Sequence, residues 1–268
     1  MSLLAQTRDG ARAVFAIAAN TLREAVRNKV FGSLMFFASL MLFFSLVLAQ
    51  MSLHQEVRLV LNVTFFASTI FTMILSVYSS VTLLHTEFER RTIYTILTKP
   101  IRRWQFLLGK YLGVLALVTI ILVVMSALSA LILWTQDAVF SSTFVYAYAA
   151  LFLQMTIVAA LAQCLATFSS PLLSGFATVA LFVGGHLFSQ LKLIQALLVE
   201  KGAGVLAQGL SAVQILLPNL ESLNLSEELT YNIAIPASYF GQALWYASSY
   251  VLVVLCVGMI IFSRKDFN

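Results

Sequence analysis

The feature that most constrains this chain is a series of long stretches that contain no charged residue. They run over residues 30–53, 59–86, 111–136, 138–191 and 229–263. Each exceeds the roughly 20 residues that an α-helix needs to cross a bilayer. The fourth is long enough for two crossings, and Ser169, Ser170 and Pro171 near its middle favour a reversal of the chain there. The sequence therefore predicts six transmembrane helices.

The composition agrees with this interpretation. Hydrophobic residues make up 60% of the chain and charged residues only 10%, which is more apolar surface than a soluble core of this length can bury. We expect an all-α polytopic membrane protein with spans at residues 32–53, 61–85, 106–134, 143–168, 172–190 and 241–262. Residues 1–268 would form a single transmembrane unit, because no repeat or separable soluble segment interrupts them.

The charged residues between the spans indicate the orientation, because Lys and Arg are retained on the cytoplasmic side. The N-terminus, the segment around residues 87–110 and the C-terminus together carry thirteen bases and five acids. The opposite segments carry three bases and six acids, so a net charge of +8 faces one of −3. We expect a multi-pass protein of the bacterial cytoplasmic (inner) membrane, with both termini in the cytoplasm. The basic balance then reflects topology, and no nucleic-acid partner is expected.

Residues 8–29 show the periodicity of an amphipathic helix. One face would carry apolar side chains and the other basic ones, with Val14, Ala18, Leu22 and Val26 set against Arg12, Arg23 and Arg27. We interpret the segment as an elbow helix that lies along the anionic lipids of the inner leaflet and joins the first span at Gly32. A solvated charged face is the alternative.

Residues 191–240 separate the fifth span from the sixth. Gly202, Gly204 and Gly209 interrupt an otherwise apolar run in this segment. A seventh span would place Arg264 and Lys265 on the outer side, against the charge rule. We therefore expect short extracytoplasmic helices that rest on the outer leaflet.

Small and hydroxyl side chains recur within the second, third and fifth spans. In the second span they follow helical spacing, at Ser68, Thr72, Ser76, Ser79 and Ser80. Gly109 and Gly113 form a pair of small residues four apart at the start of the third span. Close helix packing is the commoner explanation for such residues. The alternative for Thr72, Ser76, Ser79 and Ser80 is a polar translocation path.

Groups that carry chemistry are scarce in the spans. We expect no buried ionisable residue in any of them, which argues against a proton-coupled or ion-coupled carrier. His54, His85 and His186 are far apart in sequence, so no metal site is expected. The sequence contains no Walker phosphate loop and no Gly-x-Ser-x-Gly motif. We therefore expect a chain that is not itself an enzyme and holds no cofactor of its own.

The most informative segment is 87–110, EFERRTIYTILTKPIRRWQFLLGK, between the second and third spans. Glu87 and Glu89 stand where acids favour a helix start, and Pro100 restricts the residue before it and so ends the helix. Between them lies an apolar ridge made of Ile93, Ile96 and Leu97. A short exposed helix with such a ridge and charges of both signs is a docking surface. The alternative is a loop anchored by positive charge alone, which leaves the acids and the ridge unexplained.

This segment resembles the cytoplasmic loop of the ABC-2 (type-2 exporter) family of ABC transporter permeases. The matching positions are Glu89, Arg91, Thr92, Ile93, Ile96, Leu97, Thr98, Pro100, Ile101, Arg103, Leu108, Gly109 and Lys110. The elbow helix, the six spans and residues 217–220 before the last span extend the likeness over the whole chain. Arg91 departs from the pattern, since many relatives carry Gly there, and this leaves the subfamily and the cargo open.

The resemblance implies a permease subunit that pairs with a second permease copy and with two cytoplasmic ABC ATPase subunits, which bind ATP and Mg. Residues 87–104 would form a cytoplasmic coupling loop whose helix sits in a groove of the ATPase, with docking residues Glu87, Glu89, Arg90, Arg91, Thr92, Ile93, Ile96, Leu97, Pro100 and Arg103. Hydrolysis by that separate subunit would drive export of an amphipathic or lipid-linked substrate. The alternative is a non-transporting membrane scaffold that recruits or regulates a cytoplasmic ATPase. Residues 191–240 could also meet a periplasmic protein.

Overall fold

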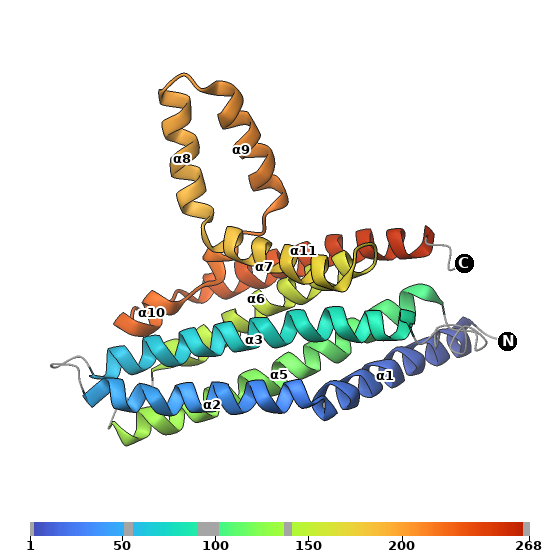
Figure 1. Ribbon diagram of the computed structural model, residues 1–268, viewed down its shortest axis with the longest axis horizontal. Helices are drawn as coiled ribbons and strands as arrows, with labels where there is room; N and C mark the ends of the chain where they lie inside the picture. Colours follow the sequence, from blue (N-terminus) through green and yellow to red (C-terminus); the bar gives the residue numbers. More distant parts are fainter. Residues whose placement is uncertain (1–2, 51–55, 90–101, 137–140, 265–268) are drawn as a thin grey trace.

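The computed structural model describes residues 3–50, 56–89, 102–136 and 141–264, and every regular element within these ranges is helical (Figure 1). The long elements are α1 (Leu3–Arg27), α2 (Lys29–Gln50), α3 (Glu56–Glu89), α5 (Arg103–Thr135), α6 (Ser142–Ala166) and α11 (Ala237–Arg264). The shorter ones are α7 (Pro171–His186), α8 (Phe188–Glu200), α9 (Gly204–Leu216), η1 (Glu221–Leu223) and α10 (Ser226–Tyr231). The expectation of an all-α protein is confirmed for this part of the chain.

Five of the described helices, α2, α3, α5, α6 and α11, are each long and apolar enough to cross a membrane. A sixth crossing is made if α7 and α8 count as one span, although they meet at an angle of 69°. The fold is therefore that of a membrane-embedded protein with several apolar helices. The predicted reversal after the fourth crossing is confirmed, because Ser170 caps α7 by accepting a hydrogen bond from the Leu173 N–H and Pro171 occupies the first turn.

The predicted fifth span, residues 172–190, does not continue as one straight helix. α7 ends at His186, where the returning chain packs against it: Leu220 N–H donates to the Gly185 carbonyl at 3.2 Å. A Cβ at Gly185 would lie 2.6 Å from the Pro218 carbonyl oxygen. This contact comes from residues far along the chain, so the local pattern of apolar residues could not indicate the break.

The helices differ in how deeply they lie within the bundle. In α6, 78% of the most apolar 18-residue window is buried inside the protein, against 17% in α2 and in α11. Figure 1 shows α2 along α3 and α11 along α6, with α1 beside the beginning of α5. The outward side of α2 carries large exposed side chains such as Phe36, Phe43 and Phe44. Such a surface suits contact with lipid chains.

The helix α1 confirms an amphipathic N-terminal segment but changes two details of it. The stripe that packs inward ends on Ala25, which is buried, whereas Val26 is 41% exposed. The junction with the next helix lies at Asn28 and not at Gly32. Asn28 caps α2 by accepting a hydrogen bond from the Val30 N–H at 3.0 Å, which explains why the chain changes direction there.

Two short helices, α8 and α9, form a hairpin that projects from the side of the bundle (Figure 1). The turn between them contains Gly202 with a φ of 72°, a left-handed conformation that glycine adopts readily. Exposed apolar side chains line the hairpin, among them Leu193, Leu197, Val199, Val205 and Leu206. The expectation of short helices in this segment is confirmed, while their place on the outer leaflet stays a prediction.

Candidate functional site at the base of α3 and α5

The candidate site lies where α3 ends at Glu89 and α5 begins at Arg103. Most of the predicted docking residues stand between these two positions. Arg90, Arg91, Thr92, Ile93, Ile96, Leu97 and Pro100 lie outside the described residues, as does the side chain of Glu89. The described part of the site therefore consists of the last turns of α3 and the first turns of α5, which flank residues 90–101 in the sequence.

A buried ammonium group joins three helices at this base. Lys110 on α5 is only 3% exposed, and its Nζ lies 2.6 Å from Glu87 Oε1 on α3. The same Nζ donates to the Leu83 carbonyl at 3.4 Å and lies 4.0 Å from Glu24 Oε2 on α1. It also sits 5.9 Å from the centre of the Phe106 ring. A buried charge is stable only when paired and hydrogen-bonded, and Lys110 meets both conditions.

The expectation that the spans hold no buried ionisable residue is therefore wrong. Lys110 falls within the predicted third span, yet the sequence alone places it among the bases of the cytoplasmic loop. The sequence does not reveal that Lys110 pairs with Glu87. The two residues are 23 positions apart, and they meet only because of the way α3 and α5 are aligned. An apparently solvated acid and base thus form an internal contact.

The beginning of α5 is also attached to the end of α11. Arg103 Nη1 donates to the carbonyls of Phe262 at 3.3 Å and Ser263 at 2.9 Å. The last carbonyls of a helix have no partner within the helix, and they carry partial negative charge that favours a guanidinium group. Gln105 Oε1 in turn accepts from the Arg102 N–H at 2.9 Å. We call the set Glu24, Glu87, Arg103 and Lys110 with these contacts the basal joint.

Two glycines of α5 allow α1 to approach closely. A Cβ at Gly113 would lie 2.6 Å from the Thr21 Cβ and 2.8 Å from the Ala18 carbonyl oxygen. A Cβ at Gly109 would lie 2.8 Å from the Ile17 Cβ. The predicted close packing at this glycine pair is confirmed. Its partner, the N-terminal helix, could not be identified from the spacing of the glycines alone.

The helix α6 is joined to α5 by two buried hydrogen bonds just beyond the basal joint. Gln163 Nε2 donates to the Leu107 carbonyl at 2.7 Å. Tyr111 donates its hydroxyl to the Thr156 carbonyl at 3.0 Å. Hydrogen bonds of this kind hold helices together in an apolar medium, where water is not a competing partner. The base of α5 thus contacts α1, α3, α6 and α11 through polar groups.

The hydroxyl stripe of α3 lies inside the protein. Thr72, Ser76, Ser79 and Ser80 are at most 5% exposed. Within the described part of the chain, the hydroxyl oxygens of Thr72, Ser76 and Ser80 have no hydrogen-bond partner. One turn before them, Ser68 meets the Tyr148 hydroxyl at 3.2 Å. The translocation path assigned to the stripe stays a prediction.

No group of three or more potential metal-ligating side chains occurs among the residues that the structure describes. No protein-family model matches the chain, and no curated protein matches it. The fold is that of a multi-helical membrane protein, and the ion pairs among its described residues, those of Lys110 with Glu24 and Glu87, lie beside the ends of α3 and α5 that flank residues 90–101.

Proposed function

We propose that the chain is the permease subunit of an ATP-driven ABC exporter. A separate nucleotide-binding subunit would hydrolyse ATP, and this chain would export an amphipathic or lipid-linked substrate. The observation that supports the proposal best is the basal joint. The end of α3 and the beginning of α5, which flank residues 90–101, are held to the bundle by polar contacts of buried or half-buried side chains, Glu87–Lys110 on one side and Arg103 on the other.

Contacts of this kind would let the ends of α3 and α5 transmit force from a bound partner to the bundle. A partner that displaces segment 90–101 would move the end of α3 and the beginning of α5 together, since Lys110 links both helices. The helix α3 contains 34 residues and is therefore about 51 Å long at 1.5 Å per residue. Because α3 is this long, a displacement of its end at the basal joint would reach the opposite end of the bundle. A transporter of this type also requires two helix packings of similar energy.

The basal joint refines the roles of the predicted docking residues. The Glu87 carboxylate faces Lys110, and the Arg103 guanidinium faces the end of α11, so these two side chains position the segment. Direct contact with the ATPase then falls to Glu89, Arg90 and Arg91. The apolar part of that contact would come from Ile93, Ile96 and Leu97, which Thr92 and Pro100 flank in the sequence.

The surface of the bundle agrees with a chain that works beside a second copy and lipid. Large apolar side chains on α11, including Leu244, Trp245 and Leu252, are more than half exposed. In the assembled exporter they would meet lipid chains or the second permease. The path between the two copies would present apolar and hydroxyl groups, which suits a substrate with a hydrophobic part.

The test is recovery of ATPase activity with the purified chain. The chain is tagged, extracted from native membranes and assayed for ATP hydrolysis, as wild type and as Glu89→Arg. Glu227→Arg on α10 is the control, because it makes the same charge change on an exposed residue of the short helix near the beginning of α3. We expect wild type and Glu227→Arg to retain the ATPase and Glu89→Arg to lose most of it.

Equal recovery with Glu89→Arg would contradict the docking assignment, and wild-type protein without any ATP-hydrolysing companion would contradict the proposal. Reconstitution distinguishes the scaffold alternative. A complex that hydrolyses ATP in vesicles and moves no labelled lipid or amphiphile across them would favour a scaffold over an exporter.

A further inference from the structure

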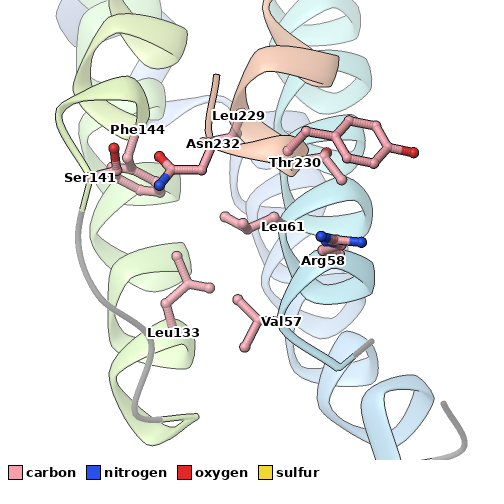
Figure 2. Close-up of a pocket in the computed structure, with 10 residues that line it drawn as sticks. Val57, Arg58, Leu61, Leu133, Ser141, Phe144, Leu229, Thr230 and Asn232 are labelled. Carbon is pink, nitrogen blue, oxygen red and sulfur yellow. The ribbon is translucent and has the colours of Figure 1, made fainter. Parts of the chain in front are cut away.

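A cavity of about 340 Å³ lies at the end of the bundle opposite to the basal joint. It is bounded by the first turns of α3, the last turns of α5, the beginning of α6 and the end of α10 (Figure 2). Its volume falls in the range of cavities that hold small ligands, about 300–1,000 Å³. One part of the wall is apolar and consists of Val57, Leu61, Leu133, Phe144 and Leu229.

The lining of the cavity also includes a cationic side chain, that of Arg58. The Arg58 guanidinium carbon lies 5.4 Å from the centre of the Tyr231 ring, a cation–π contact that holds the side chain beside the cavity. Among the residues whose side chains the structure describes, the only ion pairs are those of Lys110, so none of those carboxylates pairs with Arg58. A guanidinium group that stacks on an aromatic ring keeps its N–H donors available for an oxyanion.

The opposite side of the cavity adds polar groups. Ser141 and Asn232 lie next to one another there in Figure 2. Ser141 is the N-cap of α6 and accepts a hydrogen bond from the Thr143 N–H at 3.3 Å. The N-terminal end of a long helix carries partial positive charge, which favours an anion nearby. Asn232 ends α10 in a left-handed conformation with a φ of 52° and brings its amide to the same side.

We propose that this cavity binds an anionic amphiphile, a molecule with a phosphate or carboxylate headgroup and an alkyl chain. The chain would lie against Leu61, Leu133 and Phe144, and the headgroup would accept hydrogen bonds from Arg58. The combination of an apolar wall and the Arg58 cation selects against neutral lipids and against small inorganic anions alike. This site stands independently of the ATPase partner and of the exporter proposal.

The experiment measures lipid binding by the full chain in a neutral detergent. Labelled phosphatidylglycerol is the anionic amphiphile, and labelled phosphatidylethanolamine is the lipid without net charge. The variants are Arg58→Gln, which removes the cation, and Leu61→Trp, which fills the cavity. Lys192→Gln is the matched control, because it removes another base that sits over an aromatic ring, 4.9 Å from the centre of Phe188, outside the cavity.

We expect wild type and Lys192→Gln to bind phosphatidylglycerol alike. Arg58→Gln should bind it about tenfold more weakly, as expected for loss of a charge-assisted hydrogen bond. Leu61→Trp should also lose binding, and Arg58→Lys should restore part of it by returning the charge. Thermal unfolding and gel filtration of each variant show whether the fold is kept, so that loss of binding is read only from folded protein.

Three results would overturn the proposal. The first is equal binding of phosphatidylglycerol by wild type and Arg58→Gln. The second is equal binding of the two lipids by wild type. The third is displacement of bound phosphatidylglycerol by millimolar inorganic phosphate in wild type, because the site would then recognise free phosphate and the apolar wall would contribute nothing.

Discussion

The basal joint buries charged groups, whereas the α8–α9 hairpin exposes apolar side chains. At the joint, Lys110 is 3% exposed and is paired inside the protein with Glu87. In the hairpin, Val205 is 85% exposed and Leu193 is 64% exposed. A soluble protein would reverse this arrangement. In a bilayer the surrounding medium is itself apolar, so the specific helix contacts depend on small residues and buried polar groups, and apolar exposure is tolerated.

Among the substitutions that test this contrast, removal of one charge of the basal joint should cause the largest loss of stability. Lys110→Met leaves the Glu87 carboxylate without its cation in a nearly closed site, and loss of one partner of a buried pair costs about 3–5 kcal/mol. We expect a large fall in the thermal stability of the detergent-solubilised protein. The double variant Lys110→Met, Glu87→Met should recover most of it. A double variant as unstable as the single one would show that the pair does not hold α3 and α5 together.

The glycine contact between α1 and α5 should give the next effect. Gly113→Ala places a methyl group 2.8 Å from the backbone oxygen of Ala18, which cannot move without moving α1. We expect a loss of about 1–3 kcal/mol, typical of overpacking. Gly175→Ala on α7 is the control, because a Cβ there meets no atom within 4 Å. It should be neutral or stabilising by up to about 1 kcal/mol, since alanine favours the helix. Equal losses in both would contradict the close approach of α1.

A buried hydroxyl should give a smaller effect. The Tyr148 hydroxyl meets Ser129 at 2.8 Å and Ser68 at 3.2 Å, which joins α6 to both α5 and α3. Tyr148→Phe removes both contacts and should cost about 1–2 kcal/mol. Tyr146→Phe is the matched control: it stands two residues earlier and is 37% exposed. Melting temperatures of the two variants that coincide would show that the Tyr148 hydroxyl adds nothing to helix packing.

The smallest effect is expected in the hairpin. Val205→Ser makes an exposed position polar and should change the stability of the bundle by less than about 0.5 kcal/mol. Val118→Ser makes the same change at a position that is 0% exposed and should cost about 1–3 kcal/mol. The measurement is thermal unfolding together with light scattering. A large loss for Val205→Ser would mean that the hairpin packs against another part of the assembly.

The sequence predicts the helical fold well because each crossing is a local property of about 20 residues. The reversal at Ser170 and Pro171 and the close packing at Gly109 and Gly113 are also local, and both are confirmed. The break after His186 could not be predicted, since it depends on residues that return from far along the chain.

The candidate site is less predictable for the same reason. The acids and bases of segment 87–110 are visible in the sequence, and their number indicates a cytoplasmic loop. Which of them face inward depends on the alignment of neighbouring helices, and this is what separates Lys110 from the bases around it. Arg103 contacts the end of α11, which lies about 160 residues away in the sequence. The residues around Arg103 therefore do not indicate this contact.

The contact between α1 and α5 has a consequence for how the protein is made. Thr21 leaves the ribosome about 90 residues before Gly113, the position against which it packs. At 5–20 residues per second, the first helix waits roughly 5 to 20 seconds for its partner. During that interval two further hydrophobic helices enter the membrane. Until α5 is synthesised, the first helix therefore lacks the neighbour against which Thr21 and Ile17 pack most closely.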